Sequence, residues 1–327
     1  MEVTHRDAPI RMIGDIECQM ASPPEVVIEQ TIASLKRDLP EIEQLPEFKK
    51  PKFNEPFALA GGGPSIKYTY KELRNFRNII ACGSAHDWLI KHDIIPTYCI
   101  VLDPDRVCAA YLKHPHPNCN YLIASQCHPE VFDALKDYAV TRWHCAGMGP
   151  EWFAKAWTDA GIFDKEGKKP LIGGGCTCGL RAISIAILLG YKNLHFFGID
   201  SNVDFNNEDH HAYEFEEPEN EFLGDVLFMH LGHKETGRRF KVAKYMMAQL
   251  VGLRELIGKY GQYFDVTVHG DSITYEFMRL RKLIKDDKKL QEELELYRAK
   301  DVIEIQAPRK KPTKYINDEP QLPLNNP

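Results

Sequence analysis

Residues 57–66 read FALAGGGPSI, a four-residue apolar run that changes abruptly into three glycines, a proline and a serine. An apolar run without polar alternation is typical of a strand that is buried on both faces. Glycines permit positive φ and close backbone approach, so the amides of Gly62, Gly63 and Ser65 could donate hydrogen bonds to a phosphate. The stretch alone fits a structural turn as well as a ligand-binding loop, because it is neither a Gly-x-Gly-x-x-Gly motif nor a Walker loop.

Short apolar runs of the same kind recur along the chain and are separated by stretches with helical patterning. The candidate strands are residues 57–60, 78–82, 98–102, 121–124, 194–199 and 264–268. Strand and helix in repeated alternation predict a parallel sheet that is covered by helices. We therefore expect an α/β fold with a doubly wound, mostly parallel Rossmann-like sheet and flanking helices.

The composition divides the chain into three parts. Residues 1–56 hold an amphipathic helical pattern and then a proline-spaced charged segment, which predicts an N-terminal helix followed by a linker. Residues 57–270 carry the predicted Rossmann-like domain, including an apolar helix that starts near Thr177 and ends at Gly190. Residues 271–327 predict a charged helix and then a disordered tail that is rich in proline and polar residues.

Bulk properties argue against several classes of protein. A net charge of -6 does not suit a generally basic nucleic-acid binder. The nine cysteines are odd in number and include no Cys-x-x-Cys pair, which supports neither a disulfide framework nor a zinc ribbon. There is no charged-then-apolar leader, and no apolar run is long enough to span a bilayer, so we expect a cytoplasmic protein without a membrane span.

Polar residues follow the predicted strands at the edge where an open parallel sheet binds its ligands. Asp103 and Asp105 flank a proline after the third strand, where they could hold Mg²⁺, accept hydrogen bonds from a ribose or base, or simply begin a turn. A second glycine loop, IGGGCTCG at 172–179, contains Gly174, Gly175 and Thr177 and opens onto the apolar helix. A helix amino terminus preceded by glycines is a natural anion site.

Another set of polar residues follows the strand at 194–199. Asp200 comes directly after this strand, and His211 lies in the predicted loop that follows it. His230 and His233 lie on a further loop before the next helix. Histidine titrates near neutral pH, so each could act as a general base, although each could also be an ordinary surface residue. His230 and His233 lack a convincing third partner for a zinc site.

The order of these motifs resembles the 6-hydroxymethylpterin diphosphokinase MptE-like family. The resemblance rests on GGGPS at 61–65, the block that ends in LDPD at 102–105, the second glycine loop, and FFGID at 196–200 with the downstream His211-Ala212. The family includes flagellar motility accessory factors proposed to be glycosyltransferases, and it is more distantly similar to bacterial sialyltransferases that use CMP-sialic acid. The resemblance covers about residues 57–270.

The resemblance implies a transferase that binds a nucleotide or nucleotide-activated donor. The implied nucleotide-binding residues are Gly61, Gly62, Gly63, Ser65, Asp103, Gly174, Gly175, Thr177 and Asp200. In the leading hypothesis, glycosyl transfer from a CMP-sugar-like donor, His211, His230 or His233 would deprotonate an acceptor hydroxyl, and no metal is required.

Two alternatives remain open. A diphosphokinase acting on a hydroxymethyl, pterin-like substrate would need Mg²⁺ at Asp103 and Asp105. A binding or assembly accessory would use the loops without catalysis. The sequence does not identify the acceptor, and it leaves the oligomeric state open, a homo-oligomer included.

Overall fold

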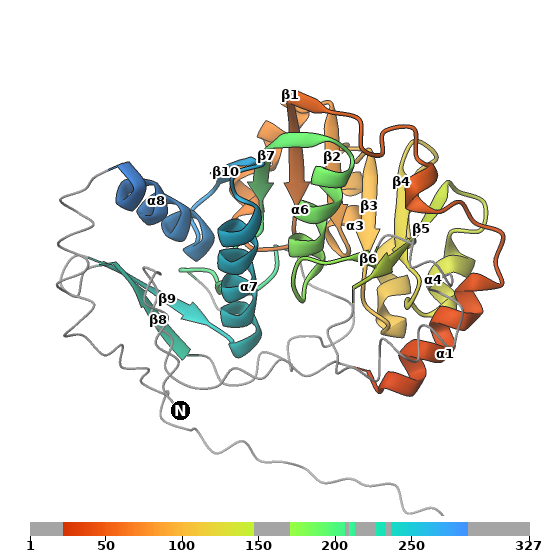
Figure 1. The fold of residues 1–327 in the computed structure, drawn as a ribbon. Helices are drawn as coiled ribbons and strands as arrows, with labels where there is room; N and C mark the ends of the chain where they lie inside the picture. Colours follow the sequence, from red (N-terminus) through yellow and green to blue (C-terminus); the bar gives the residue numbers. More distant parts are fainter. Residues whose placement is uncertain (1–21, 147–170, 207–208, 213–226, 233–236, 287–327) are drawn as a thin grey trace, which may run out of the picture.

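The computed structural model describes residues 22–146, 171–206, 209–212, 227–232 and 237–286. An eight-stranded sheet has the order β10-β7-β1-β2-β3-β4-β5-β6 (Figure 1). All seven neighbouring pairs in it are parallel. Its strands are β1 (Lys52–Ala60), β2 (Asn78–Cys82), β3 (Tyr98–Val101), β4 (Asn120–Ala124), β5 (Val140–Cys145), β6 (Leu171–Ile172), β7 (Tyr191–Phe197) and β10 (Asp265–His269). The predicted fold class is confirmed.

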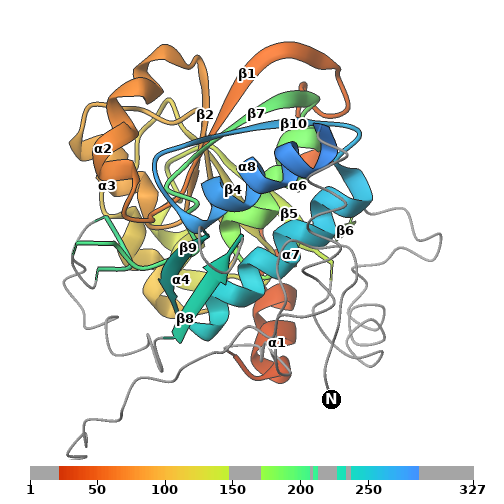
Figure 2. The ribbon, with the colours of Figure 1, turned by 90° about the vertical axis from the view of Figure 1, so that its left-hand side faces the viewer.

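Helices cover both faces of the sheet, as Figure 2 shows. One face carries α2 (Ile66–Thr69), η2 (Tyr70–Asn75) and α3 (Ala85–Lys91), and the other carries α6 (Cys178–Leu188) and α7 (Lys244–Tyr260). The remaining helices are α1 (Pro24–Leu35), η1 (Ile42–Gln44), η3 (Arg106–Leu112), α4 (Pro129–Ala134) and α8 (Ile273–Asp286). The apolar helix predicted from Thr177 is α6, and the chain leaves it through Gly190, whose φ of 89° favours glycine.

The predicted strands differ from the structure at β1 and at β5. β1 begins at Lys52, inside the segment predicted as a linker, because the strand passes through Pro56 with a shift in its register against β7. β5 was not predicted, because Arg142 and His144 interrupt its apolar run although both are buried. A charged residue in a buried strand hides the pattern on which strand prediction depends.

The N-terminal flank packs against the same sheet. Val27 of α1 and Ile42 of η1 belong to the main hydrophobic core. The amide of Arg142 in β5 donates to the carbonyl of Pro40, and the Arg142 guanidinium donates to one carboxylate oxygen of Glu41 at 3.0 and 2.6 Å. The flank therefore contributes to the core of the domain, and the expected boundary between residues 56 and 57 falls inside β1.

A two-stranded antiparallel sheet, β8 (Leu227–Leu231) and β9 (Arg238–Val242), lies apart from the large sheet. The amide of Val203, shortly after β7, donates to the carbonyl of Lys241 in β9 at 2.9 Å. The hairpin is thus attached near the carboxyl end of β7. The predicted tail lies outside the described residues.

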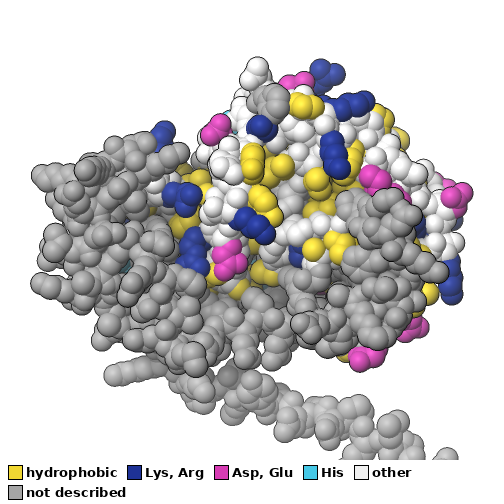
Figure 3. Space-filling model, in the orientation of Figure 1, with side chains coloured by type: hydrophobic (Ala, Val, Ile, Leu, Met, Phe, Trp, Pro, Cys, Tyr) yellow, Lys and Arg dark blue, Asp and Glu magenta, His cyan; other side chains and the backbone are white. Residues whose placement is uncertain are grey.

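Two observations concern a membrane span and a basic surface patch. Among the described helices, none combines the length and apolar character of a membrane span. In the view of Figure 3, the Lys and Arg side chains are scattered among apolar and acidic ones and do not gather into one basic patch.

Candidate functional site

The strand order of the large sheet reverses at β1. From β1 the chain adds strands β2 to β6 in one direction and then returns to add β7 and β10 on the other side of β1. An open α/β sheet binds ligands outside the carboxyl ends of its strands, where the order reverses. The loop after β1 contains Gly61 to Ser65, and the loop after β7 contains Gly198 and Asp200.

The first glycine loop is held tightly against the loop after β7. The amide of Gly61 donates to the Phe197 carbonyl at 2.7 Å, and the amide of Gly63 donates to the Gly198 carbonyl at 2.8 Å. A Cβ atom at Gly61 would collide with the Gly198 carbonyl oxygen, and a Cβ atom at Gly198 would collide with the Gly61 carbonyl oxygen. The glycines are therefore required by the close approach of two backbone segments.

The side chain of Asp200 holds the first glycine loop through hydrogen bonds. Its carboxylate accepts hydrogen bonds from the Ser65 amide at 2.7 Å and the Ser65 hydroxyl at 2.6 Å, and its side chain is buried. Burial, opposed by these two hydrogen bonds, raises the pKa of Asp200 to about 6, and Asp204 and Asp271 add repulsion. Of the three amides expected to face a phosphate, those of Gly63 and Ser65 are thus committed to protein acceptors. That expectation fails for these two groups.

His211 lies beside the same loop. The amide of Ala212 donates to the Gly62 carbonyl at 2.8 Å, and the rings of His210 and His211 have centroids 4.3 Å apart. Burial and the neighbouring His210 lower the pKa of His211 to about 4, although a hydrogen bond with the Gly62 backbone opposes the change. The imidazole is therefore neutral at pH 7 and can accept a proton only as a weak base.

The second glycine loop joins β6, at one edge of the sheet, to α6. Gly174 and Gly175 have φ values of 126° and 98°. Thr177 is the N-cap residue of α6, and its hydroxyl accepts a hydrogen bond from the Leu180 amide at 3.4 Å. A Cβ atom at Gly179 would lie 3.5 Å from Ile199, the residue that also packs against Gly61. The start of α6 therefore lies close to the segment that follows β7.

Asp103 lies close to the start of α6. Its carboxylate is exposed, and desolvation by the surrounding protein together with Asp105 raises its pKa. Burial and the charge of Asp103 raise the pKa of the Cys178 thiol to about 12. Asp105 caps η3 by accepting a hydrogen bond from the Val107 amide at 2.9 Å, which is the turn role considered for it. Asp105 is therefore engaged in a capping bond, whereas Asp103 is exposed and makes no such bond.

The described residues hold no cluster of three His, Cys, Asp or Glu side chains that could bind a metal ion by themselves. Mg²⁺ commonly takes one or two carboxylates together with substrate phosphates, so Asp103 still fits a Mg²⁺ that arrives with a nucleotide.

The other predicted histidines lie elsewhere. His230 is half-buried on β8 and pairs in register with Arg239 of β9. His233 lies outside the described residues. The structure thus brings His211, but not His230, against the first glycine loop.

Arg181 is a residue of this region that the sequence analysis missed. It lies in the first turns of α6 with a side chain only 2% exposed. Its guanidinium donates to the carbonyls of Ile172 and Ala146, at the carboxyl ends of β6 and β5. The signal was present, because Arg181 is the single charged residue in the apolar stretch that forms α6.

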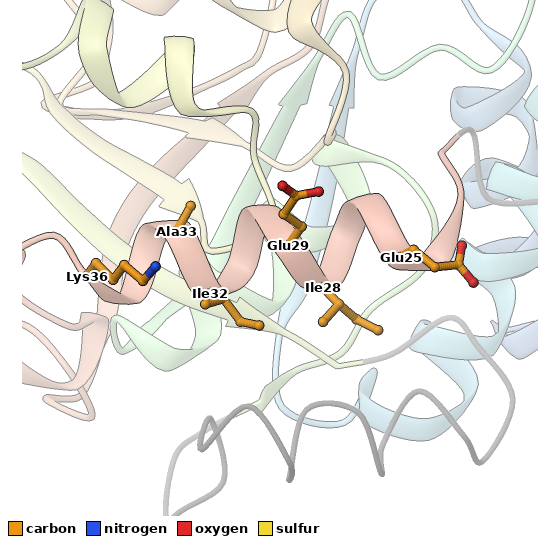
Figure 4. Close-up of a pocket in the computed structure, with 6 residues that line it drawn as sticks. All are labelled: Glu25, Ile28, Glu29, Ile32, Ala33 and Lys36. Carbon is orange, nitrogen blue, oxygen red and sulfur yellow. The ribbon is translucent and has the colours of Figure 1, made fainter.

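A hollow of about 420 Å³ runs along α1 and is lined by Glu25, Ile28, Glu29, Ile32, Ala33 and Lys36 (Figure 4). None of the predicted site residues lines it. The candidate site is therefore defined by loops and strand ends at the carboxyl edge of the sheet.

Two glycine loops and several acidic side chains at the carboxyl edge of a parallel sheet define a Rossmann-like α/β protein. The chain belongs to the 6-hydroxymethylpterin diphosphokinase MptE-like family, whose model matches residues 29–204. This confirms the family resemblance inferred from the order of the motifs.

Among solved structures, the chain is similar to a MAf glycosyltransferase from Magnetospirillum magneticum AMB-1, with 18% identity and a TM-score of 0.55. The match covers 78% of this chain but only 38% of that one. It is also similar to a mammalian sialyltransferase in complex with Gal-beta-1-3GalNAc-ortho-nitrophenol, with 9% identity, a TM-score of 0.39, and coverage of 83% of this chain and 93% of that chain. No curated protein sequence matches. At 18% identity, the likeness to the MAf glycosyltransferase extends to the fold alone.

Proposed function

We propose that this protein is a transferase that binds a nucleotide-activated donor in the crevice between its two glycine loops. The observation that carries the proposal is the convergence of the first loop, the Gly198–Asp200 segment and the start of α6 around Ile199. Parallel sheets bind nucleotides at such a point, and a helix amino terminus favours the phosphate of the ligand.

Glycosyl transfer from a nucleotide sugar, such as a CMP-sugar, to an acceptor hydroxyl is the reaction that we favour. The similarity in fold to a glycosyltransferase supports this choice. The departing nucleotide phosphate would be stabilised by backbone amides and the amino end of α6. Because the match spans only part of that glycosyltransferase, the donor and the acceptor are open to experiment.

The proton of the acceptor hydroxyl requires a base. His211 is the candidate beside the crevice, and its neutral imidazole can accept a proton across the pH range above about 4. His230 and His233 are the alternatives on or near the β8–β9 hairpin. Variants His211→Asn and His230→Asn, assayed for release of free nucleotide from the donor and for transfer to acceptor, separate these roles. The variant that lacks the catalytic base should lose transfer to the acceptor but should still bind the donor.

A diphosphokinase is the second candidate, because the family is described by that activity. Asp103 would then hold Mg²⁺ with the phosphates of ATP, while Asp105 has a capping role that leaves it less suited to the task. An Asp103→Asn variant that keeps full Mg²⁺-dependent turnover would exclude this reading.

A thermal-shift screen of CMP, UDP, GDP, ATP and CMP-sugars, with and without Mg²⁺, tests the proposal. A ligand that binds only the folded protein raises the midpoint of unfolding. We expect stabilisation by at least one nucleotide, and stabilisation without Mg²⁺ favours glycosyl transfer. The absence of any shift would contradict both enzymatic readings and leave a binding or assembly role.

A further inference from the structure

The two glycine loops differ in the charge and in the hydrogen-bond donors that they offer. The first loop has two amides committed to the backbone of the β7 segment and a third committed to Asp200. Asp204 adds negative charge near Asp200, whereas Asp271 is paired with Arg238. A phosphate at the first loop would therefore find few donors and two nearby carboxylates, those of Asp200 and Asp204, that have no cation paired with them among the described residues.

The second loop offers more donors and a cation, although the Asp103 carboxylate also lies close to the start of α6. The amides of Gly174 and Gly175 donate to no acceptor among the described residues. The loop leads into the amino terminus of α6, an 11-residue helix. The partial positive charge of such a terminus attracts anions.

Arg181 adds a full positive charge at this place. The side chain of a helical residue leans toward the amino end of the helix. The Arg181 guanidinium accordingly reaches the carbonyl of Ile172, the residue that precedes the glycines, and the carbonyl of Ala146 at 3.3 Å. It therefore lies at the carboxyl ends of β5 and β6, where the second loop begins.

The charge of Arg181 has no counter-ion in the described part of the chain. Its side chain is 2% exposed, its Nε atom is buried without a partner, and both of its acceptors are neutral carbonyls. The other buried arginine among the described residues, Arg142, is paired with Glu41. Burying a charge without a counter-ion is unfavourable in free energy. An anion bound near Arg181 would therefore reduce the free-energy cost that the ligand-free protein carries.

We propose that the second glycine loop holds the charged phosphate part of the ligand, that Arg181 is the positioning residue that supplies its uncompensated charge, and that the first loop binds only an uncharged part of the ligand. This inference rests on the proposed nucleotide site. It assigns the charged part of the ligand to the second loop and the uncharged part to the first. The ligand class is one that carries a diphosphate or phosphate next to an uncharged sugar or base.

Inorganic pyrophosphate is the probe that isolates the charged part. We expect it to bind the full-length protein and to slow amide hydrogen exchange at residues 172–182 but not at 61–66. Arg181→Met should weaken pyrophosphate binding by roughly tenfold, the effect of losing one charged contact. Arg181→Lys, which keeps the charge, should recover most of the affinity.

A matched control is Arg74→Met, which also removes a guanidinium that donates to a backbone carbonyl, that of His92, but on an exposed surface. It should leave pyrophosphate binding unchanged. Binding of an uncharged nucleoside, such as cytidine, should be equal in wild type and Arg181→Met, whereas a purely structural role of Arg181 would weaken both ligands.

Equal pyrophosphate affinity in wild type and Arg181→Met, or protection at 61–66 in place of 172–182, would overturn the inference. The exchange experiment uses the wild-type protein, so it decides the question even if both variants misfold. If nucleotides bind but pyrophosphate protects residues 61–66, the assignment of the phosphate to the second loop is wrong, and the proposed function stands. If pyrophosphate protects 172–182 but no nucleotide binds, the proposed function fails alone.

Discussion

At the scale of single residues, the tightest constraint is the contact between the backbones of Gly61 and Gly198. Each carbonyl oxygen occupies the space in which a Cβ atom of the other residue would stand. Gly198 also has a φ of 60°, so a side chain there would be strained in any case. The close approach of the segments that follow β1 and β7 therefore depends on glycine.

Gly61→Ala should destabilise the protein by about 1 to 3 kcal/mol, because the added methyl group overpacks a site bounded by backbone. Chemical denaturation of the variant and the wild type measures the change. Gly258→Ala in α7 is the matched control, since a Cβ atom there would meet nothing within 4 Å. The control should be neutral or slightly stabilising, because alanine is the better helix former. Equal effects of the two substitutions would refute this account of the loop.

Asp200 shows what sequence can and cannot indicate about a site residue. Its position after a strand correctly predicts that it lies at the carboxyl edge beside the first glycine loop. Its partners, the Ser65 amide and hydroxyl, lie 135 residues away in sequence, and no local pattern indicates that the carboxylate faces the protein. In the structure, Asp200 holds the first glycine loop through Ser65.

The raised pKa of Asp200 predicts a pH dependence of stability. Its folded pKa is about 6, against an ordinary value of 3.8, so the folded protein holds this proton more tightly than the unfolded chain does. The contribution to stability is present below about pH 4 and is lost as the pH rises through 6. The difference corresponds to about 3 kcal/mol.

Denaturation of wild type and Asp200→Asn at several pH values checks this prediction. Relative to the variant, the wild type should lose stability between pH 4 and pH 7. A constant difference between the two proteins across that range would mean that Asp200 titrates at its ordinary pKa.

At the scale of elements, apolar runs correctly predict β2, β3 and β4 to within a residue or so, because buried parallel strands carry few polar residues. The same reasoning misses β5, in which Arg142 and His144 are buried beside Glu41 of the N-terminal flank. A long-range ion pair of this kind leaves no local signature. It also helps to explain why the N-terminal flank packs against the sheet.

Glu41→Gln should destabilise the protein by about 3 to 5 kcal/mol, because it leaves the Arg142 guanidinium buried without a counter-ion. Burial alone would raise the pKa of Glu41, but hydrogen bonds from His144 and Arg142 outweigh it and lower the pKa to about 2. The wild-type pair therefore stabilises the fold above pH 4.5 and weakens as the pH falls toward 2. Glu55→Gln, an exposed carboxylate of β1, is the control and should change little.

At the scale of the whole molecule, the order of strands and helices correctly predicts the class of fold but not the path of the chain between the loops. The second glycine loop follows β6, at the far edge of the sheet from β10, yet α6 packs on β1, β2, β3 and β7. This crossing brings the start of α6 to Ile199 and the first loop. Only the three-dimensional arrangement shows that the start of α6 lies beside the segment that follows β7.

The central claim is that a nucleotide binds in this crevice, with its phosphate at the start of α6. The most direct measurement is a crystal structure of the full chain with the nucleotide that gives the largest thermal shift. We predict phosphate density against the second glycine loop and the first turn of α6, with the sugar or base toward Gly62. A nucleotide bound along α1, or with its phosphate against Asp200 at the first loop, would contradict the account.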